Sequence, residues 1–274
     1  MPAQYTDLSP VQARAFMAAH GQDAFTLLDV RQDWEYEETH IPGARHVPLP
    51  ELSDRAGELD PSKPVLAYCR SGKRSSAAAG FLAGQGFARV LNLAGGISAW
   101  QGQTVSGGPD LGLDLFAGAA GPRDVVLRAC CMERNLDRLY TALAGKARDR
   151  ETGETLALLA GFERKHVALL LAIHRQATGE ALGEEDFQRL ALDQALEGGI
   201  TAERFLEDNP DLLASPRTAL EAGMAVEAHA LDLYARLAAT SPDQEAGKLL
   251  LRLADEEKAH LKALGALLDR LGDA

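Results

Sequence analysis

Two sets of metal-ligand residue types repeat in the second half of the chain. Each set has a glutamate, a tyrosine seven residues later and a Glu-x-x-His pair: Glu133, Tyr140, Glu163 and His166, then Glu227, Tyr234, Glu257 and His260. Every member of the second set follows its counterpart by 94 positions. Residues three positions apart lie on one face of a helix, so the carboxylate and imidazole of each Glu-x-x-His pair can point together. Six ligand-type side chains could therefore reach one pair of metal ions.

The spacing within each set predicts a helical hairpin. The lone glutamate precedes the Glu-x-x-His glutamate by 30 residues in both sets, so a turn at the midpoint would bring the two level. Asp149 lies near the first midpoint, where it would cap the next helix, and Ser241-Pro242 offers the second hairpin a cap followed by a helical proline. We expect long helices near residues 122–146, 149–177, 215–239 and 242–271, with a crossover containing short helices around 184–196 and 201–207.

The donor atoms of this set indicate which metal it would hold. Four carboxylates and two imidazoles make a hard, oxygen-rich site, which favours iron, with manganese as the alternative, over zinc. Four carboxylates also balance the charge of two divalent ions. A single Glu-x-x-His on a charged helix is usually a solvated pair, but two copies with matching glutamates favour metal binding. The expected cofactor is two iron ions.

The same segments resemble the rubrerythrin branch of the ferritin-like superfamily over roughly residues 122–274. The resemblance rests on Cys-Cys-Met-Glu at 130–133 with its tyrosine, and on Asp-Glu-Glu-Lys-Ala-His at 255–260. It implies a four-helix bundle with a di-iron site, Tyr140 and Tyr234 as hydrogen-bond partners behind the ligands, redox chemistry on oxygen or peroxide, an external electron donor, and pairing as a homodimer.

Two features depart from that family. Ala230, three residues after Glu227, stands where rubrerythrins have a further glutamate, and the chain has no Cys-x-x-Cys pair for a rubredoxin centre. The extra ligand and the built-in electron relay are therefore missing. His229 is turned by about 100° from its neighbour on a helix, which predicts a surface or interface position.

A reactive cysteine is expected in the first hundred residues, where apolar runs at 25–28, 64–68 and 89–93 alternate with helical stretches. That alternation predicts an α/β layer with a mostly parallel sheet. Cys69 follows the second run and precedes a small-residue helix at about 75–85. The helix N-terminus, the loop amides and nearby cations would stabilise a thiolate, and also a persulfide or an oxyanion such as thiosulfate. A Cys-x5-Arg phosphatase loop would be one residue longer, because Arg74 is only five positions past Cys69.

This half resembles a single-domain rhodanese over about residues 5–102. The matching motifs are Leu28-Asp29-Val30-Arg31, Trp34-Glu35-Tyr36, His40-Ile41-Pro42-Gly43-Ala44, the six-residue loop from Cys69 to Arg74, and Gly95-Gly96-Ile97-Ser98-Ala99-Trp100. The resemblance implies that Cys69 accepts sulfane sulfur as a persulfide and passes it to a thiol or cyanide-like acceptor. Arg70 and Arg74 would bind the donor and stabilise the persulfide, while Asp29, Arg31 and Glu35 would anchor the fold. The substrate would lie in the loop formed by Arg70, Ser71, Gly72, Lys73, Arg74 and Ser75.

Composition and length agree with a two-domain protein. The chain has 274 residues, 46% hydrophobic residues and a net charge of −12, a balance that does not favour nucleic-acid binding. We expect a rhodanese-like domain at 1–104, a linker at 105–121 and a ferritin-like bundle at 122–274. The absence of an apolar leader or a long apolar run, together with only three cysteines, predicts a cytoplasmic protein away from the membrane.

The sequence thus predicts a sulfurtransferase fused to a di-iron bundle active in redox chemistry. Two alternatives remain: a bundle that binds or delivers iron beside a sulfide supply, and a bundle that only dimerises. Cys130 lies three residues before Glu133, on roughly the same helical face. It is either a thiol that links persulfide to the metals or, as we prefer, a small residue that packs the core.

Overall fold

The computed structural model describes residues 5–119, 121–188 and 195–272, and these form two compact units, Met1–Asp110 and Leu111–Ala274. Each unit is described separately. No helix in the described ranges combines the length and the apolar character needed to cross a bilayer.

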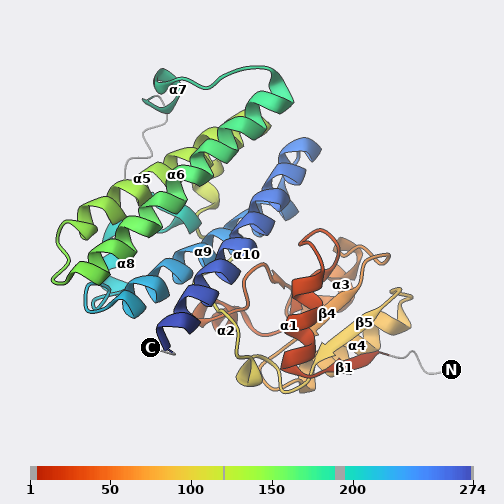
Figure 1. Cartoon of the computed structure of the whole chain (residues 1–274). Coiled ribbons are helices and arrows are strands. Elements are labelled where there is room, and N and C mark those ends of the chain that lie inside the picture. Colours follow the sequence, from red (N-terminus) through yellow and green to blue (C-terminus); the bar gives the residue numbers. More distant parts are fainter. Residues whose placement is uncertain (1–4, 120, 189–194, 273–274) are drawn as a thin grey trace. The chain divides into compact units, whose positions relative to one another are not determined.

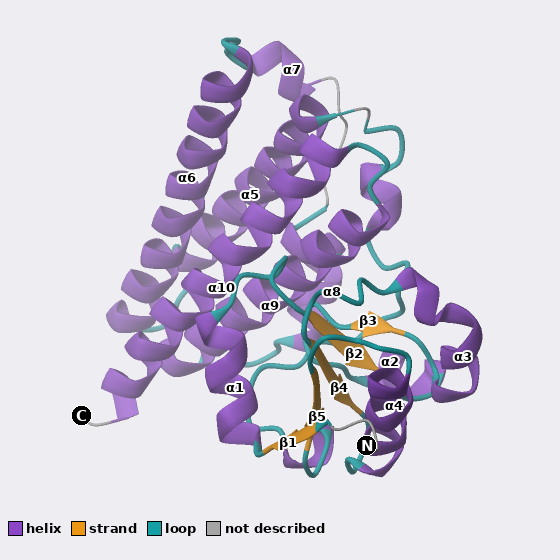
Figure 2. Ribbon diagram, turned by 90° about the vertical axis from the view of Figure 1, so that its right-hand side faces the viewer, coloured by secondary structure: helices purple, strands orange, loops and turns teal. Residues whose placement is uncertain are grey.

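The first unit is built on a sheet of five parallel strands in the order β1-β5-β4-β2-β3. The strands are β1 (Thr6–Leu8), β2 (Thr26–Asp29), β3 (Arg45–His46), β4 (Val65–Tyr68) and β5 (Val90–Leu93), and the helices are α1 (Pro10–Ala19), α2 (Asp33–Glu38), α3 (Leu52–Arg55) and α4 (Lys73–Gly84). Figure 2 shows the strands enclosed by helices. This confirms the α/β layer and the parallel sheet; β1 and the two-residue β3 were not predicted.

Alternate residues of the central strands pack into two separate hydrophobic cores, one on each face of the sheet. Leu28, Val65 and Ala67 pack with Ala78 and Leu82 of α4 on one face. On the other face, residues such as Leu27, Leu66 and Leu91 pack with Phe16 of α1 and Tyr36 of α2. Both faces of a parallel sheet are therefore covered, which explains why the strands read as continuous apolar runs. The carboxyl ends of β2 and β4 lie side by side in the sheet, where Asp29 pairs with Tyr68.

The second unit is a bundle of four long helices: α5 (Pro122–Ala144), α6 (Arg150–Thr178), α9 (Pro216–Thr240) and α10 (Gln244–Gly272). Figure 1 shows α5 beside α6 and α9 beside α10, as two hairpins. The helix ends lie within two residues of those predicted. The crossover between the hairpins holds α7 (Glu184–Gln188), a 3-10 turn η5 (Glu197–Gly199) and α8 (Ala202–Asp208). The predicted first short helix continues over 189–194, outside the described residues.

The hairpin turns follow the predicted caps in one case and depart from them in the other. Asp149 caps α6, accepting a hydrogen bond from the Thr152 amide at 2.8 Å. Ser241 does not cap α10; it ends α9, and Asp243 instead accepts a hydrogen bond from the Ala246 amide at 2.7 Å. A carboxylate is as good a cap as a hydroxyl, and it lies one residue before the helix, which begins at Gln244.

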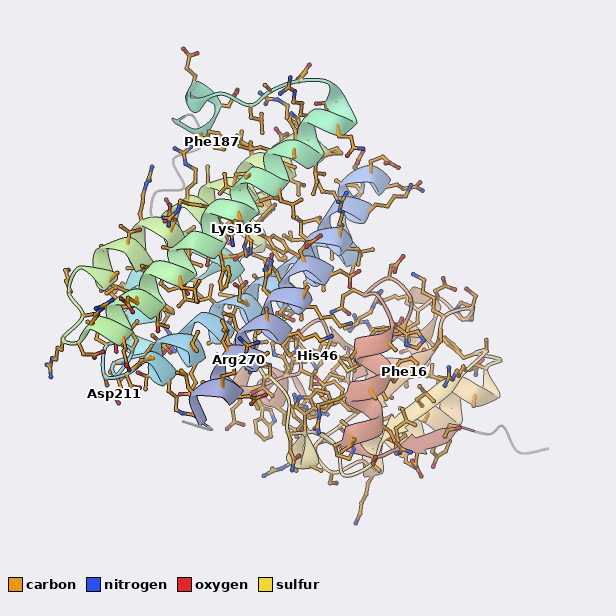
Figure 3. All side chains as sticks on the ribbon, in the orientation of Figure 1. Phe16, His46, Lys165, Phe187, Asp211 and Arg270 are labelled. Atoms are coloured by element: carbon orange, nitrogen blue, oxygen red, sulfur yellow. The ribbon has the colours of Figure 1, made fainter. Side chains whose placement is uncertain are left out.

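The crossover is tied to the long helices. The guanidinium of Arg134 of α5 lies over the ring of Phe187 of α7, with Cζ 4.7 Å from the ring centroid; Figure 3 labels Phe187 on the crossover. Another short 3-10 turn, η4 (Leu113–Phe116), contributes Phe116 to the bundle core, where its ring meets Tyr234 edge-on. The apolar piece around Leu113 and Phe116 thus packs on the bundle itself.

Candidate functional site

Cys69 lies at the carboxyl end of β4, in a loop that leads into α4. Its side chain is buried, and its Sγ accepts a hydrogen bond from the Gly72 amide at 3.1 Å. The hydroxyl of Ser75 lies 3.4 Å from the same sulfur and 2.6 Å from Asn92 Oδ1. Asn92 in turn donates to Asp7 at 2.7 Å. The sulfur therefore adjoins a chain of polar side chains that runs from the buried Ser75 and Asn92 to the exposed carboxylate of Asp7.

These donors set the charge state of Cys69. Burial on its own raises the pKa of the Cys69 thiol, but hydrogen bonds from the Ser75 hydroxyl and from the amides of Ser75, Ser71 and Gly72 outweigh it, so the pKa lies below its ordinary value. A larger fraction of Cys69 is consequently the nucleophilic thiolate near neutral pH.

Glycines hold the loop in shape. Gly72 has a φ of +88°, and a Cβ there would lie 3.0 Å from the Gly95 amide nitrogen. A Cβ at Gly96 would meet the Cys69 carbonyl oxygen at 2.2 Å. The amide of Ile97 donates to that carbonyl at 2.8 Å. The Gly95-Gly96 motif therefore fixes the backbone under the cysteine, a role that requires the absence of side chains.

The predicted cationic side chains lie differently around the loop. Arg74 is held by two hydrogen bonds to Glu35, at 2.6 and 2.7 Å, and that pairing raises its pKa, with the nearby Cys69 sulfur adding to the effect. Arg70, Ser71 and Lys73 are exposed. The predicted anchors Asp29 and Arg31 form a buried pair at 2.6 Å.

The six predicted metal-type ligands meet inside the bundle, on four helices. Glu133 and Glu227 come from α5 and α9, and the two Glu-x-x-His pairs come from α6 and α10. Five of the six are buried, and His260 is about a quarter exposed. Arg164 and Lys165, between Glu163 and His166 in sequence, are exposed, whereas Glu163 and His166 are buried, so α6 turns its two ligand-type residues inward. Figure 3 labels Lys165 on α6.

Each imidazole faces the carboxylates of its own half. His166 Nδ1 lies 3.2 Å from Glu133 Oε2 and 3.4 Å from Glu163 Oε2. His260 Nδ1 lies 2.9 Å from Glu257 Oε2 and 4.0 Å from Glu227 Oε2. The ligand atoms of Glu227, Glu257, His260 and His166 all lie within 4.8 Å of one another. His166, from the first repeat, therefore lies within reach of the ligand atoms of the second repeat.

Charge in this cluster is concentrated and poorly solvated. Burial raises the pKa of Glu133, Glu227 and Glu257 well above the ordinary range, and the neighbouring carboxylates raise it further. Burial and the adjacent His166 lower the pKa of His260 to about 3, whereas the surrounding carboxylates, Glu163 above all, outweigh burial and raise that of His166. Positive ions placed among these groups would offset the unfavourable free energy of burying several carboxylates together.

A seventh residue, Glu197 of η5, was not predicted. It is fully buried, and its carboxylate groups with Glu133, Glu163 and His166, with ligand atoms within 4.8 Å of one another. Tyr234 donates a hydrogen bond to Glu197 Oε1 at 3.1 Å, so this tyrosine contacts a carboxylate outside the predicted six. The only signal in the sequence was an acidic residue before a glycine pair, Glu197-Gly198-Gly199, in the crossover.

The remaining candidates from the sequence are Tyr140, His229 and Cys130, none of which is in the two groups of ligand-type residues. Tyr140 is buried, with its ring edge-on to Phe205 of α8. His229 is half-buried and bonds through Nδ1 to the Ala225 carbonyl oxygen at 2.8 Å. Cys130 belongs to an apolar core cluster, and burial raises its pKa to about 12. A thiol in that environment stays protonated.

Comparison with known proteins identifies both halves. The family model described as rhodanese-like domain matches residues 10–103, and the model described as rubrerythrin matches residues 124–268. The first half is 43% identical over 82 residues, 30% of this chain, to the putative sulfur carrier protein YrkF of Bacillus subtilis. The chain spans 44% of the length of that relative.

Two further likenesses fall on the same half. The thiosulfate sulfurtransferase GlpE of Pseudomonas syringae is 33% identical over 98 residues, which is 36% of this chain and 89% of that protein. The solution structure of the rhodanese-like domain of the Anabaena Alr3790 protein is 32% identical, with a TM-score of 0.35, over 38% of this chain and 80% of that one. The rubrerythrin model covers more than half of the whole chain. The chain therefore belongs to the rubrerythrin family and carries a rhodanese-like domain ahead of the bundle.

Proposed function

We propose that the first domain is a sulfurtransferase that works through a Cys69 persulfide. The Cys69 thiolate attacks the sulfane sulfur of a donor such as thiosulfate. A sulfur–sulfur bond forms to Cys69, the bond within thiosulfate breaks, and sulfite leaves with the electron pair. A thiolate or cyanide then attacks the outer sulfur of the persulfide and returns Cys69 to its thiolate form, so no external oxidant or reductant is needed.

The observation that carries this proposal is the hydrogen-bond set on Cys69 Sγ. The Gly72 amide donates to Sγ at 3.1 Å, and together with the amides of Ser71 and Ser75 and the Ser75 hydroxyl, which lies 3.4 Å away, it lowers the pKa of a thiol that is otherwise buried. Arg74 stays charged against Glu35, and its guanidinium interacts favourably with negative charge on the Cys69 sulfur. Arg70 and Lys73, which are exposed at the loop, would attract the anionic donor.

We propose that the bundle holds two iron ions between its hairpins. The donor set is oxygen-rich, as iron prefers. Glu163 Oε2 and Glu227 Oε2 are buried without a hydrogen-bond partner among the described residues, which is costly unless a cation takes their lone pairs. Glu133, Glu163 and His166 would hold one ion, and Glu227, Glu257 and His260 the other. Iron bound there would supply one-electron chemistry toward oxygen or peroxide.

Cys69→Ser tests the first proposal. Thiosulfate-to-cyanide transfer should fall by at least about a thousandfold, because serine is not a comparable nucleophile at neutral pH. Cys130→Ala, in the bundle core, is the matched control and should keep the full rate. Equal activity of the wild type and Cys69→Ser would contradict the assignment.

Metal analysis after anaerobic iron loading tests the second. We expect about two iron ions per wild-type chain by mass spectrometry, and none in the double variant Glu163→Ala, Glu257→Ala. Peroxide consumption by the loaded protein, with an added electron donor, would support redox turnover. Iron that passes to a chelator without any peroxide turnover would instead favour storage or delivery.

A further inference from the structure

A fifth carboxylate lies among the ligand atoms of the bundle, and it comes from the crossover rather than from a long helix. Glu197 is fully buried. One of its oxygens lies within 4.8 Å of ligand atoms on Glu133, Glu163 and His166. It therefore belongs to one end of the cluster, the end formed by the first hairpin.

The chain around Glu197 is held in place on both sides. Ala195 and Thr201 form an antiparallel bridge, and the Leu196 amide donates to the Ile200 carbonyl at 2.8 Å. Asn135 of α5, two residues past Glu133, donates its side-chain amide to the Ala195 carbonyl at 2.9 Å. These contacts close the crossover into a tight loop with Glu197 at its tip.

The glycine after Glu197 brings the tip against α9. Gly198 has a φ of +78°, and a Cβ there would lie 2.4 Å from the Cβ of His229. Only glycine combines that backbone conformation with that closeness. The loop consequently packs directly against the backbone of α9, the helix that carries Glu227.

The two oxygens of Glu197 differ in their contacts. Oε1 accepts the hydroxyl proton of Tyr234 at 3.1 Å. Oε2 is buried and has no hydrogen-bond partner within the described part of the chain. A buried carboxylate oxygen without a partner costs free energy unless it is bound by a donor or a cation. Its neighbours at the first-hairpin end are two carboxylates and an imidazole, which is a cation site.

We propose that Glu197 is a direct ligand of one of the two iron ions, the one held by Glu133, Glu163 and His166. This inference rests on the proposed function of the bundle. In the described residues the group that contains Glu227, Glu257 and His260 has His166 as its fourth member, where the first group has the carboxylate of Glu197. The two ions therefore occupy unlike donor sets, and five ionised carboxylates carry one more negative charge than two divalent ions neutralise.

Anaerobic equilibrium dialysis of the full chain against Fe(II), with iron measured by mass spectrometry, tests the assignment. Glu197→Gln keeps the side-chain volume and an oxygen for Tyr234 but removes the charge. We expect two ions per chain in the wild type, and in the variant one ion bound at least about tenfold more weakly. Glu180→Gln changes an exposed carboxylate of the same crossover and should bind like the wild type.

Tyr234→Phe separates a ligand role from a structural one. If Glu197 only anchors Tyr234, Tyr234→Phe should weaken iron binding, whereas Glu197→Gln, which keeps an acceptor for the tyrosine, should bind iron like the wild type; that pattern would overturn the inference. If Glu197 is a ligand, Tyr234→Phe should retain both ions within about threefold of the wild-type affinity.

The remaining outcomes are distinguishable. Wild type and Glu197→Gln that both bind two ions with equal affinity would refute the inference and leave the proposed function standing. A wild type that binds no iron would refute both. If Glu197→Gln does not fold by circular dichroism, Mössbauer spectroscopy of the wild type loaded with ⁵⁷Fe(II) decides: two unlike ferrous doublets of equal area are expected, and a single doublet contradicts unlike donor sets.

Discussion

The imidazole rings of His166 and His260 stack with centroids 3.6 Å apart and planes 10° from parallel. These residues are equivalent members of the two sequence repeats, one on α6 and the other on α10. Two imidazolium ions could not stack at that distance, which agrees with opposite pKa shifts for the pair. Where the rings meet, the ligand atoms of both hairpins come together, since those of Glu227, Glu257 and His260 lie within 4.8 Å of His166.

The alkylation of Cys69 should depend on pH in a way that reports its hydrogen bonds. Because the pKa of this thiol lies below its ordinary value, the rate with iodoacetamide should rise with pH and level off at a lower pH than for a free cysteine. Ser75→Ala removes one donor, so the midpoint should move upward. Ser71→Ala removes only an exposed hydroxyl and keeps the backbone amide. Equal midpoints for both variants would show that Ser75 does not act on the sulfur.

The Glu35–Arg74 pair should be worth measurable stability. Glu35→Gln replaces a buried carboxylate that accepts two hydrogen bonds from Arg74. We expect the free energy of unfolding to fall by about 1–3 kcal/mol, and the loss is limited because Arg74 is one-third exposed. Calorimetric unfolding of the full chain would show the rhodanese-like transition at a lower temperature. Glu58→Gln is the control, since Glu58 pairs with Arg45 and Arg55 at the surface and should cost no more than about 0.5 kcal/mol. Similar losses in both variants would contradict a special role for Glu35.

Gly198→Ala should damage the bundle more than a comparable glycine replacement. The added Cβ would lie 2.4 Å from His229 at a φ of +78°, so the loop must move, and we expect a loss of about 2 kcal/mol or more. Gly179→Ala has a similar φ of +74° but open space around its Cβ, so it should cost about 1 kcal/mol. Denaturant unfolding of both variants measures the difference. If the two losses are equal, the packing of Gly198 on α9 contributes nothing.

Iron should stabilise only the bundle. Each ion present at a hundred times its dissociation constant adds about 2.7 kcal/mol, or roughly 5–10 °C per ion for a domain of this size. Calorimetry should therefore show the bundle transition rising on anaerobic loading and falling again with a chelator, while the rhodanese-like transition stays fixed. The double variant Glu163→Ala, Glu257→Ala should show no rise. A rise of the same size in that variant would place the bound iron elsewhere.

The helical repeat made the six ligand-type residues predictable. The lone glutamate and the Glu-x-x-His glutamate are 30 residues apart in both hairpins, and the two sets are 94 residues apart. Because a helix has a constant rise per residue and each turn falls midway, these equal spacings bring the two glutamates of each hairpin to the same level. The tight turn between α9 and α10 was harder: Ser241 and Asp243 are both good caps, and sequence preference does not choose between them. The two-residue β3 was missed because Arg45 and His46 form no apolar run.

Glu197 could not be predicted for a different reason. It belongs to neither repeat, and its place beside Glu133 depends on the path of an irregular loop, set by the Asn135 contact and the packing of Gly198. Neither contact follows from helical or strand periodicity. The glycine pair after Glu197 was visible, but glycine pairs usually mark an ordinary turn.

The joining of the two hairpins by one crossover also has a consequence for the symmetry of the cluster. A single hairpin with one glutamate and one Glu-x-x-His could build the same site by pairing with an identical copy, but a two-fold dimer presents every residue twice. Joining the copies through one crossover removes that constraint, because the connecting segment exists once. Glu197 lies on that segment. The single crossover thus offers a position at which one half of the cluster can be altered by mutation while the other is kept.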